Sequence, residues 1–124
     1  MGSGDYGALP RTGVAVVSPI KWWQWLPIFH WRLVGAVESA DEVPARLPRN
    51  GVVAVGPESA PKWIAFDCPC RAGHRIMLNT DRARRPHWSI TSSRRRLTIT
   101  PSVDSQRGSQ RCHYVVLEGH IRWV

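Results

Sequence analysis

Apolar and alternating segments fill the second half of the chain and predict a series of short strands. Residues 52–55 form an apolar run that ends at Gly56-Pro57, which is typical of a buried strand. Residues 62–66 and 74–78 flank a polar tip at 68–73 and predict a hairpin. Further strands are predicted at residues 87–91, 97–100, 112–117 and 120–124, with turns at 92–96 and at Glu118-Gly119.

The first third of the chain has a weaker pattern. Residues 1–20 are rich in Gly and Pro and are interpreted as an arm with at most an edge strand near 14–17, whereas residues 21–124 are predicted to form a single domain. Ser39 followed three residues later by Glu42 predicts a capping box and a short helix, which Pro48 would end. The fold class is therefore α+β, mostly antiparallel β: a small sheet of hairpins with one short helix.

Charge is concentrated in the second half. Residues 61–124 contain twelve basic and four acidic residues, which account for the whole net charge of +8. The arginines of the 82–96 cluster, with Trp88 among them, would combine phosphate contacts with a stacking surface, so one hypothesis is a nucleic-acid-binding protein. The alternative is that Arg84, Arg85, Arg94 and Arg95 contact an acidic protein surface.

Four of the seven tryptophans lie within residues 22–31. Exposed aromatic side chains mark interfaces, so Trp22 and Trp23 are predicted to bind a protein partner. There is no apolar run long enough to span a membrane and no secretory signal at the start, so we expect a cytoplasmic protein without membrane contact.

The segment Cys68-Pro69-Cys70-Arg71-Ala72-Gly73-His74 predicts a metal site. Three cysteines cannot all form disulfides within one chain, and thiolates on a tight turn are suited to bind zinc. Cys112-His113 supplies further candidates, but neighbouring strand residues point to opposite faces, so both bind one metal only if the strand is irregular there. Two ligand sets remain open: Cys68, Cys70 and Cys112 with either His74 or His113. The domain is thus expected to be zinc-stabilised.

Several segments together resemble a known bacterial family. They are residues 61–70, 73–79, 85–88 and 100–103, followed by Cys112-His113-Tyr114 and Gly119-His120-Ile121-Arg122-Trp123. The chain resembles, over roughly residues 50–124, the uncharacterised domain-of-unknown-function family numbered sixty-five twenty-seven. Its members are small, are thought to bind metal through these cysteines and are often encoded beside ubiquitin-like proteins and their conjugating enzymes.

The resemblance implies a role and a preferred ligand. It implies an accessory zinc-binding module that interacts with proteins in a bacterial ubiquitin-like conjugation pathway, with a ubiquitin-like protein or its conjugating enzymes as partner. It favours His113 as the fourth ligand because this residue lies inside the matching motif. Family members often read Cys-Gly-Cys-Gly where this chain has Cys70-Arg71-Ala72-Gly73, so a ligand set that includes the missing cysteine does not apply.

The alternative function is a small hydrolase, a peptidase or esterase, that removes a ubiquitin-like protein from its conjugates. Ser102 would be the nucleophile, His113 the base and Asp104 the orienting group. Cys70 with His74 is a second nucleophile–base pair. The hydrolase and the preferred zinc site compete for His113, because an imidazole that binds zinc cannot also act as a general base.

Overall fold

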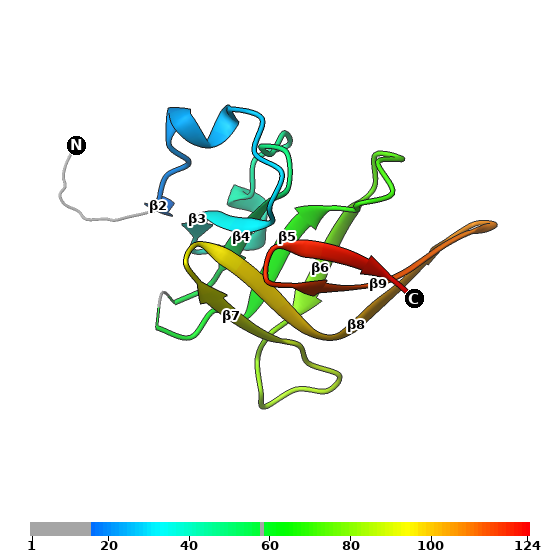
Figure 1. Cartoon of the computed structure of the whole chain (residues 1–124). Helices are drawn as coiled ribbons and strands as arrows, with labels where there is room; N and C mark the ends of the chain where they lie inside the picture. The colour runs from blue at the N-terminus through cyan, green and yellow to red at the C-terminus, as the bar shows by residue number, and fades with distance from the viewer. Residues whose placement is uncertain (1–15, 58) are drawn as a thin grey trace, which may run out of the picture.

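The computed structural model describes residues 16–57 and 59–124, which form two β-sheets (Figure 1). The first sheet has the strand order β2-β3-β4-β5-β6 and the second the order β10-β9-β8-β7. The first contains β2 (Val16–Ser18), β3 (Arg32–Val37), β4 (Gly51–Val55), β5 (Trp63–Asp67) and β6 (Arg75–Asn79). The second contains β7 (Ser89–Ser93), β8 (Arg96–Arg107), β9 (Gln110–Leu117) and β10 (His120–Trp123).

The main core lies between the two sheets. Alternate residues of β5 and β6 pack against alternate residues of β8 and β9, as the period of two requires. Phe66 of β5 meets Trp31 edge to face, with ring centroids 5.6 Å apart, and Tyr114 of β9 is fully buried. The predicted strands thus face each other as a sandwich rather than as one sheet.

A second, smaller core covers the other face of the first sheet. Val34 and Val37 of β3 pack there with Val53 and Val55 of β4 and with Leu47. All five residues of β4 are buried, because this strand is covered on both faces. That burial explains the uninterrupted apolar run at 52–55, which lacks the alternation of a strand with one wet face.

The short helix that was expected after Ser39 is not an α-helix. The capping box between Ser39 and Glu42 is present, but it begins only a 3-10 turn, η2 (Ala40–Glu42). Within residues 16–57 and 59–124 the helical elements are η2 and a second 3-10 turn, η1 (Trp22–Trp25), and there is no α-helix. None of these elements is long and apolar enough to cross a membrane.

Strand β3 was not predicted. It pairs in parallel with β4, so the first sheet is not purely antiparallel. Its central Gly35 interrupts the apolar pattern, and a Cβ there would lie 2.8 Å from the carbonyl oxygen of Ser18 on the neighbouring chain segment. The residues 14 and 15 of the predicted edge strand lie outside the described residues, and β2 begins at Val16.

Candidate active site

Ser102 lies in an irregular part of β8. Ile99 is paired with Val116 and Val103 with Tyr114, so β8 uses four residues where β9 uses two. The extra residues form a bulge, and Pro101, which an unbroken alternation would place in the core beside Ile99, is exposed. Bulges are common next to functional sites, and Ser102 lies within this one, on the outer face of the sheet because the next residue, Val103, points into the core.

The hydroxyl of Ser102 meets the imidazole of His113. Ser102 Oγ lies 3.1 Å from His113 Nε2, and both side chains are half-buried. His113 precedes the buried Tyr114 on β9, so the alternation of the strand turns its ring away from the core. Among the described residues this is the one hydrogen bond between a serine hydroxyl and a histidine.

Asp104 faces His113 across the two strands but is hydrogen-bonded to another residue. The two residues are direct Cα partners. The Asp104 carboxylate accepts hydrogen bonds from Arg111 Nε at 2.9 Å and Nη2 at 2.6 Å. The bonds from Arg111 hold the pKa of Asp104 below its usual value, and the nearby charge of His113 lowers it further. Arg111 was missed as part of this site, although its spacing of two from His113 places both on one face.

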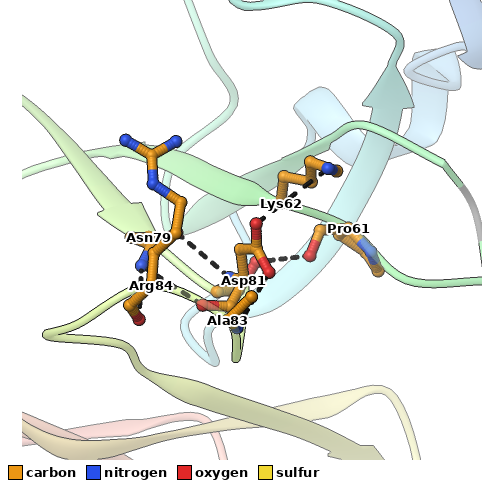
Figure 2. A network of polar contacts seen from close by, with 7 residues as sticks. Pro61, Lys62, Asn79, Asp81, Ala83 and Arg84 are labelled. Carbon is orange, nitrogen blue, oxygen red and sulfur yellow. Dashed lines mark hydrogen bonds and ion pairs between the residues drawn. The ribbon is translucent and has the colours of Figure 1, made fainter.

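A structured loop supports the Ser102 backbone. Asn79 Nδ2, at the end of β6, donates to the carbonyl oxygens of three loop residues, Asp81, Arg84 and Pro86. Figure 2 shows Asn79 beside Asp81 and Arg84. The carbonyl oxygen of Asn79 also accepts the backbone N–H of Trp88 at 2.8 Å. Trp88 Nε1 in turn donates to the carbonyl oxygen of Ser102 at 3.2 Å. Trp88 therefore connects the loop to the bulge, a role that its place among the arginines did not indicate.

A cluster of three cysteines and one histidine lies on the inner, core-facing side of β9. The side-chain ligand atoms of Cys68, Cys70, His74 and Cys112 all lie within 4.8 Å of one another. The first three come from the tip between β5 and β6, where Arg71 and Gly73 have positive φ and the N–H of Arg71 bonds to the carbonyl oxygen of Cys68. Cys112 comes from β9, so the cluster joins the two sheets and could hold a metal ion.

The donor set fits a tetrahedral metal ion. Zinc–thiolate bonds of about 2.3 Å place ligand atoms about 3.8 Å apart at the corners of a tetrahedron. Cys70 Sγ lies 3.8 Å from the ring nitrogens of His74. Burial raises the pKa of the Cys68 thiol to about 12, so a cation is needed to keep this buried group as a thiolate.

The two histidines are therefore separated. His74 lies with the cysteines, whereas His113, the ligand that the sequence favoured, lies outside the cluster and contacts Ser102. The reason is the regular alternation of β9: Cys112 points into the core and His113 points out. The competition for His113 between metal and hydrolysis does not arise in this geometry.

The arginines among the predicted partner-binding residues lie at the two ends of β7. Arg94 and Arg95 form the two-residue turn between β7 and β8, and Arg95 stacks over Trp23 at 5.6 Å from the ring centroid. Arg84 lies in the loop at the other end of β7 and stacks over Trp63, and Arg85 follows it. The arginines of the 82–96 cluster are thus split into two groups. Trp22 is 77% exposed.

Comparison with known families gives a match over most of the chain. Residues 39–124 match the family described as "Bacterial ubiquitination-like system serine protease (BubE)". The match covers more than two thirds of the chain, which therefore belongs to this family. No curated protein and no solved structure was found to be similar to the chain.

The family corrects the functional expectation. A bacterial ubiquitination-like system is confirmed as the setting, which makes proteins the expected partners. The interpretation of the chain as a purely accessory interaction module is wrong, because the family is described as a serine protease. The match favours the hydrolase alternative and gives no support to nucleic-acid binding.

Proposed function

We propose that this chain is a serine protease that releases a ubiquitin-like protein from its precursor or conjugates, with Ser102 as nucleophile and His113 as general base. The observation that carries the proposal is the distance of 3.1 Å between Ser102 Oγ and His113 Nε2, at a bulge on the outer face of the second sheet. The family description supports the reaction class.

The chemistry proceeds in two steps. Ser102 Oγ attacks the carbonyl carbon at the end of the ubiquitin-like chain while His113 Nε2 accepts the hydroxyl proton. The same proton passes to the leaving nitrogen or oxygen as the bond breaks, which leaves an acyl-enzyme ester. Water then attacks this ester, with His113 again accepting and returning a proton, and frees the carboxylate and Ser102.

Asp104 is proposed to stabilise the charged imidazole of His113. The two residues are cross-strand partners without a hydrogen bond between them, so the effect is electrostatic rather than directional. The pair of bonds from Arg111 fixes the carboxylate and partly offsets its charge. We therefore expect Asp104 to contribute much less than an orienting aspartate that bonds its histidine directly.

We assign the metal cluster a structural role and zinc as its ion. Three thiolates and one imidazole, from Cys68, Cys70, Cys112 and His74, complete a tetrahedron and leave no position for a reacting water. When bound, zinc would supply a cross-link between the tip of the first sheet and β9. Ser102 and His113 would then carry the reaction.

The test compares Ser102→Ala with Ser105→Ala. The probe substrate is the ubiquitin-like protein of the same system, fused through its C-terminus to a reporter protein. Ser102→Ala is expected to lower the cleavage rate at least about 10⁴-fold and to abolish labelling by a fluorophosphonate. Ser105, three residues along the same strand and without a contact to His113, is the matched control and should leave both unchanged. Equal cleavage by the two variants would refute the proposal.

A further inference from the structure

The second half of β8 has one edge without a partner strand. β7 pairs with β8 only from Arg96 to Thr100, and β9 covers the opposite edge as far as Arg107. Beyond Thr100, no backbone hydrogen bond from another described segment reaches β8 on the β7 side. The end of the β8–β9 hairpin, in orange, extends beyond the rest of the molecule (Figure 1). A free edge therefore begins beside Ser102.

The hairpin loop determines which backbone groups point to this edge. Gly108 and Ser109 form a two-residue loop, and its flanking residues Arg107 and Gln110 form a hydrogen-bonded pair. Hydrogen-bonded and non-hydrogen-bonded pairs alternate along an antiparallel ladder. Asp104 and Gln106 therefore belong to non-hydrogen-bonded pairs, and their N–H and C=O groups point away from β9 to the free edge.

Two contacts independently support the conclusion that the backbone groups of Asp104 and Gln106 point to the free edge. Trp88 comes from the β7 side and bonds to the carbonyl oxygen of Ser102, which shares its orientation with Asp104 and Gln106. On the other edge, the carbonyl oxygen of His113 accepts the N–H of Val124 at 2.9 Å. His113 is the partner of Asp104, so its backbone also points away from the space between β8 and β9.

We propose that the substrate binds as an added strand on this edge, with its backbone hydrogen-bonded to Asp104 and Gln106. This inference rests on the proposed function. At a rise of about 3.3 Å per residue, Asp104 lies about 7 Å along the strand from Ser102, so the pairing begins about two residues from the scissile carbonyl. Extended peptides commonly bind to free sheet edges in this way, where main-chain bonds give affinity.

The bound segment is the acyl side of the substrate, the C-terminal tail of the ubiquitin-like protein. In a conjugate the leaving group is attached through a side chain, so it presents no continuous backbone at the scissile bond. The acyl side is a polypeptide in every substrate of the system. A backbone edge that continues from the nucleophile is suited to this constant part.

Amide hydrogen exchange in the Ser102→Ala variant tests binding without turnover. The probe is the intact ubiquitin-like protein of the same system, at about ten times its Kd. The N–H groups of Asp104 and Gln106 are expected to exchange about tenfold more slowly, whereas Val103 and Ser105 already bond to β9 and change little. Arg111, whose N–H points to the opposite edge of the hairpin, is the matched control. Protection at Arg111 in place of Gln106, or no protection on β8, would overturn the proposal.

Gln106→Pro gives a second, kinetic test. Proline is tolerated at an edge position whose N–H bonds to no neighbouring strand, so the hairpin should remain folded. Loss of this one substrate bond is expected to lower kcat/KM by up to about tenfold, mainly through KM. If Gln106→Pro cleaves like the unaltered protein while Ser102→Ala is inactive, the edge inference fails and the protease proposal stands. If Ser102→Ala remains active, the protease proposal fails whatever the exchange data show.

Discussion

The two faces of β9 carry different chemistry on neighbouring residues. On the inner face, Cys112 joins two cysteines and a histidine from the other sheet. On the outer face, His113 meets the hydroxyl of Ser102. Cys68, His74 and Cys112 of the inner group are buried, and burial raises the pKa of the Cys68 and Cys112 thiols, whereas the outer pair is half-buried.

This difference indicates a division of labour. A metal ion bound at Cys112 would fix the position of β9 relative to the tip of the first sheet. His113 is the next residue on that strand, so its ring is held by the same backbone. The inner face is expected to determine stability and the outer face activity. Loss of the metal site should lower activity by unfolding the protein, whereas substitutions on the outer face should leave metal content and stability unchanged.

The largest effect on activity is expected from His113→Ala. His113→Ala should lower kcat/KM about 10⁴-fold, because Ser102 loses the group that accepts its proton. Its metal content and Tm should match those of the unaltered protein. Cleavage of the reporter fusion, elemental analysis and thermal unfolding measure the three quantities.

His74→Ala is the matched control for that experiment. It removes an imidazole from the inner face, so metal content and Tm are expected to fall. Activity measured on the fraction that remains folded should be retained. The comparison of faces is wrong if His113→Ala releases the metal, or if folded His74→Ala protein is as inactive as His113→Ala.

Cys112→Ser tests the coupling between the faces. The variant is expected to lose its metal and several kcal/mol of unfolding free energy, because binding free energy at a structural site is folding free energy. Activity should decline together with the folded fraction. Ser105→Ala is the control, since Ser105 faces Cys112 across the ladder without being a ligand. Denaturant unfolding with and without a zinc chelator measures the effect; a chelator that left stability unchanged would contradict the structural role.

Most strands could be predicted from the sequence because their patterns are local. The alternation at 112–117 and the Glu118-Gly119 turn are each determined by a few adjacent residues, and both are found in the structure. β3 was missed because it pairs in parallel with β4 and Gly35 breaks its apolar pattern. The helix expected after Ser39 is only a 3-10 turn, since the capping box specifies where a helix begins but not how far it continues.

The site residues were identified more readily than their grouping. Cys68, Cys70, Ser102 and His113 were all recognised as candidates, but the assignment of His113 to metal or serine depends on which face of β9 it occupies. A local irregularity was expected at Cys112, whereas the bulge lies in β8, at Ser102. Pro101 was the available signal, because a proline inside a strand marks an edge or a bulge, but the strand was predicted to end at residue 100 instead of continuing to Arg107.

A smaller effect is expected from Trp88→Phe. The indole N–H donates to the carbonyl oxygen of Ser102, and phenylalanine retains a smaller aromatic ring without the donor. Loss of one hydrogen bond is worth about 0.5–1.5 kcal/mol, so kcat/KM should fall by up to about tenfold with metal content unchanged. Trp22→Phe is the control, because Trp22 is exposed and lies in η1, outside the second sheet. Equal kinetics for the two variants would show that the Trp88 bond does not position Ser102.

The smallest effect concerns the pKa of Asp104 on the outer face. Arg111 lowers this pKa in the folded protein, so the ion pair stabilises the hairpin above the unfolded pKa of about 4. This contribution is lost as the pH falls through the lowered, folded value. Arg111→Gln should therefore raise the Asp104 pKa towards its ordinary value, as measured by carboxyl-carbon NMR titration.

Arg107→Gln is the control for that titration, because Arg107 lies in the same hairpin and forms no ion pair within the described residues. It should leave the Asp104 pKa in place. The metal cluster should be unaffected by either substitution, since Arg111 and Arg107 are both exposed on the hairpin. A change in metal content on Arg111→Gln would mean that a change on the outer face of β9 affects the inner face, contrary to the one-way dependence inferred from the position of Cys112 next to His113.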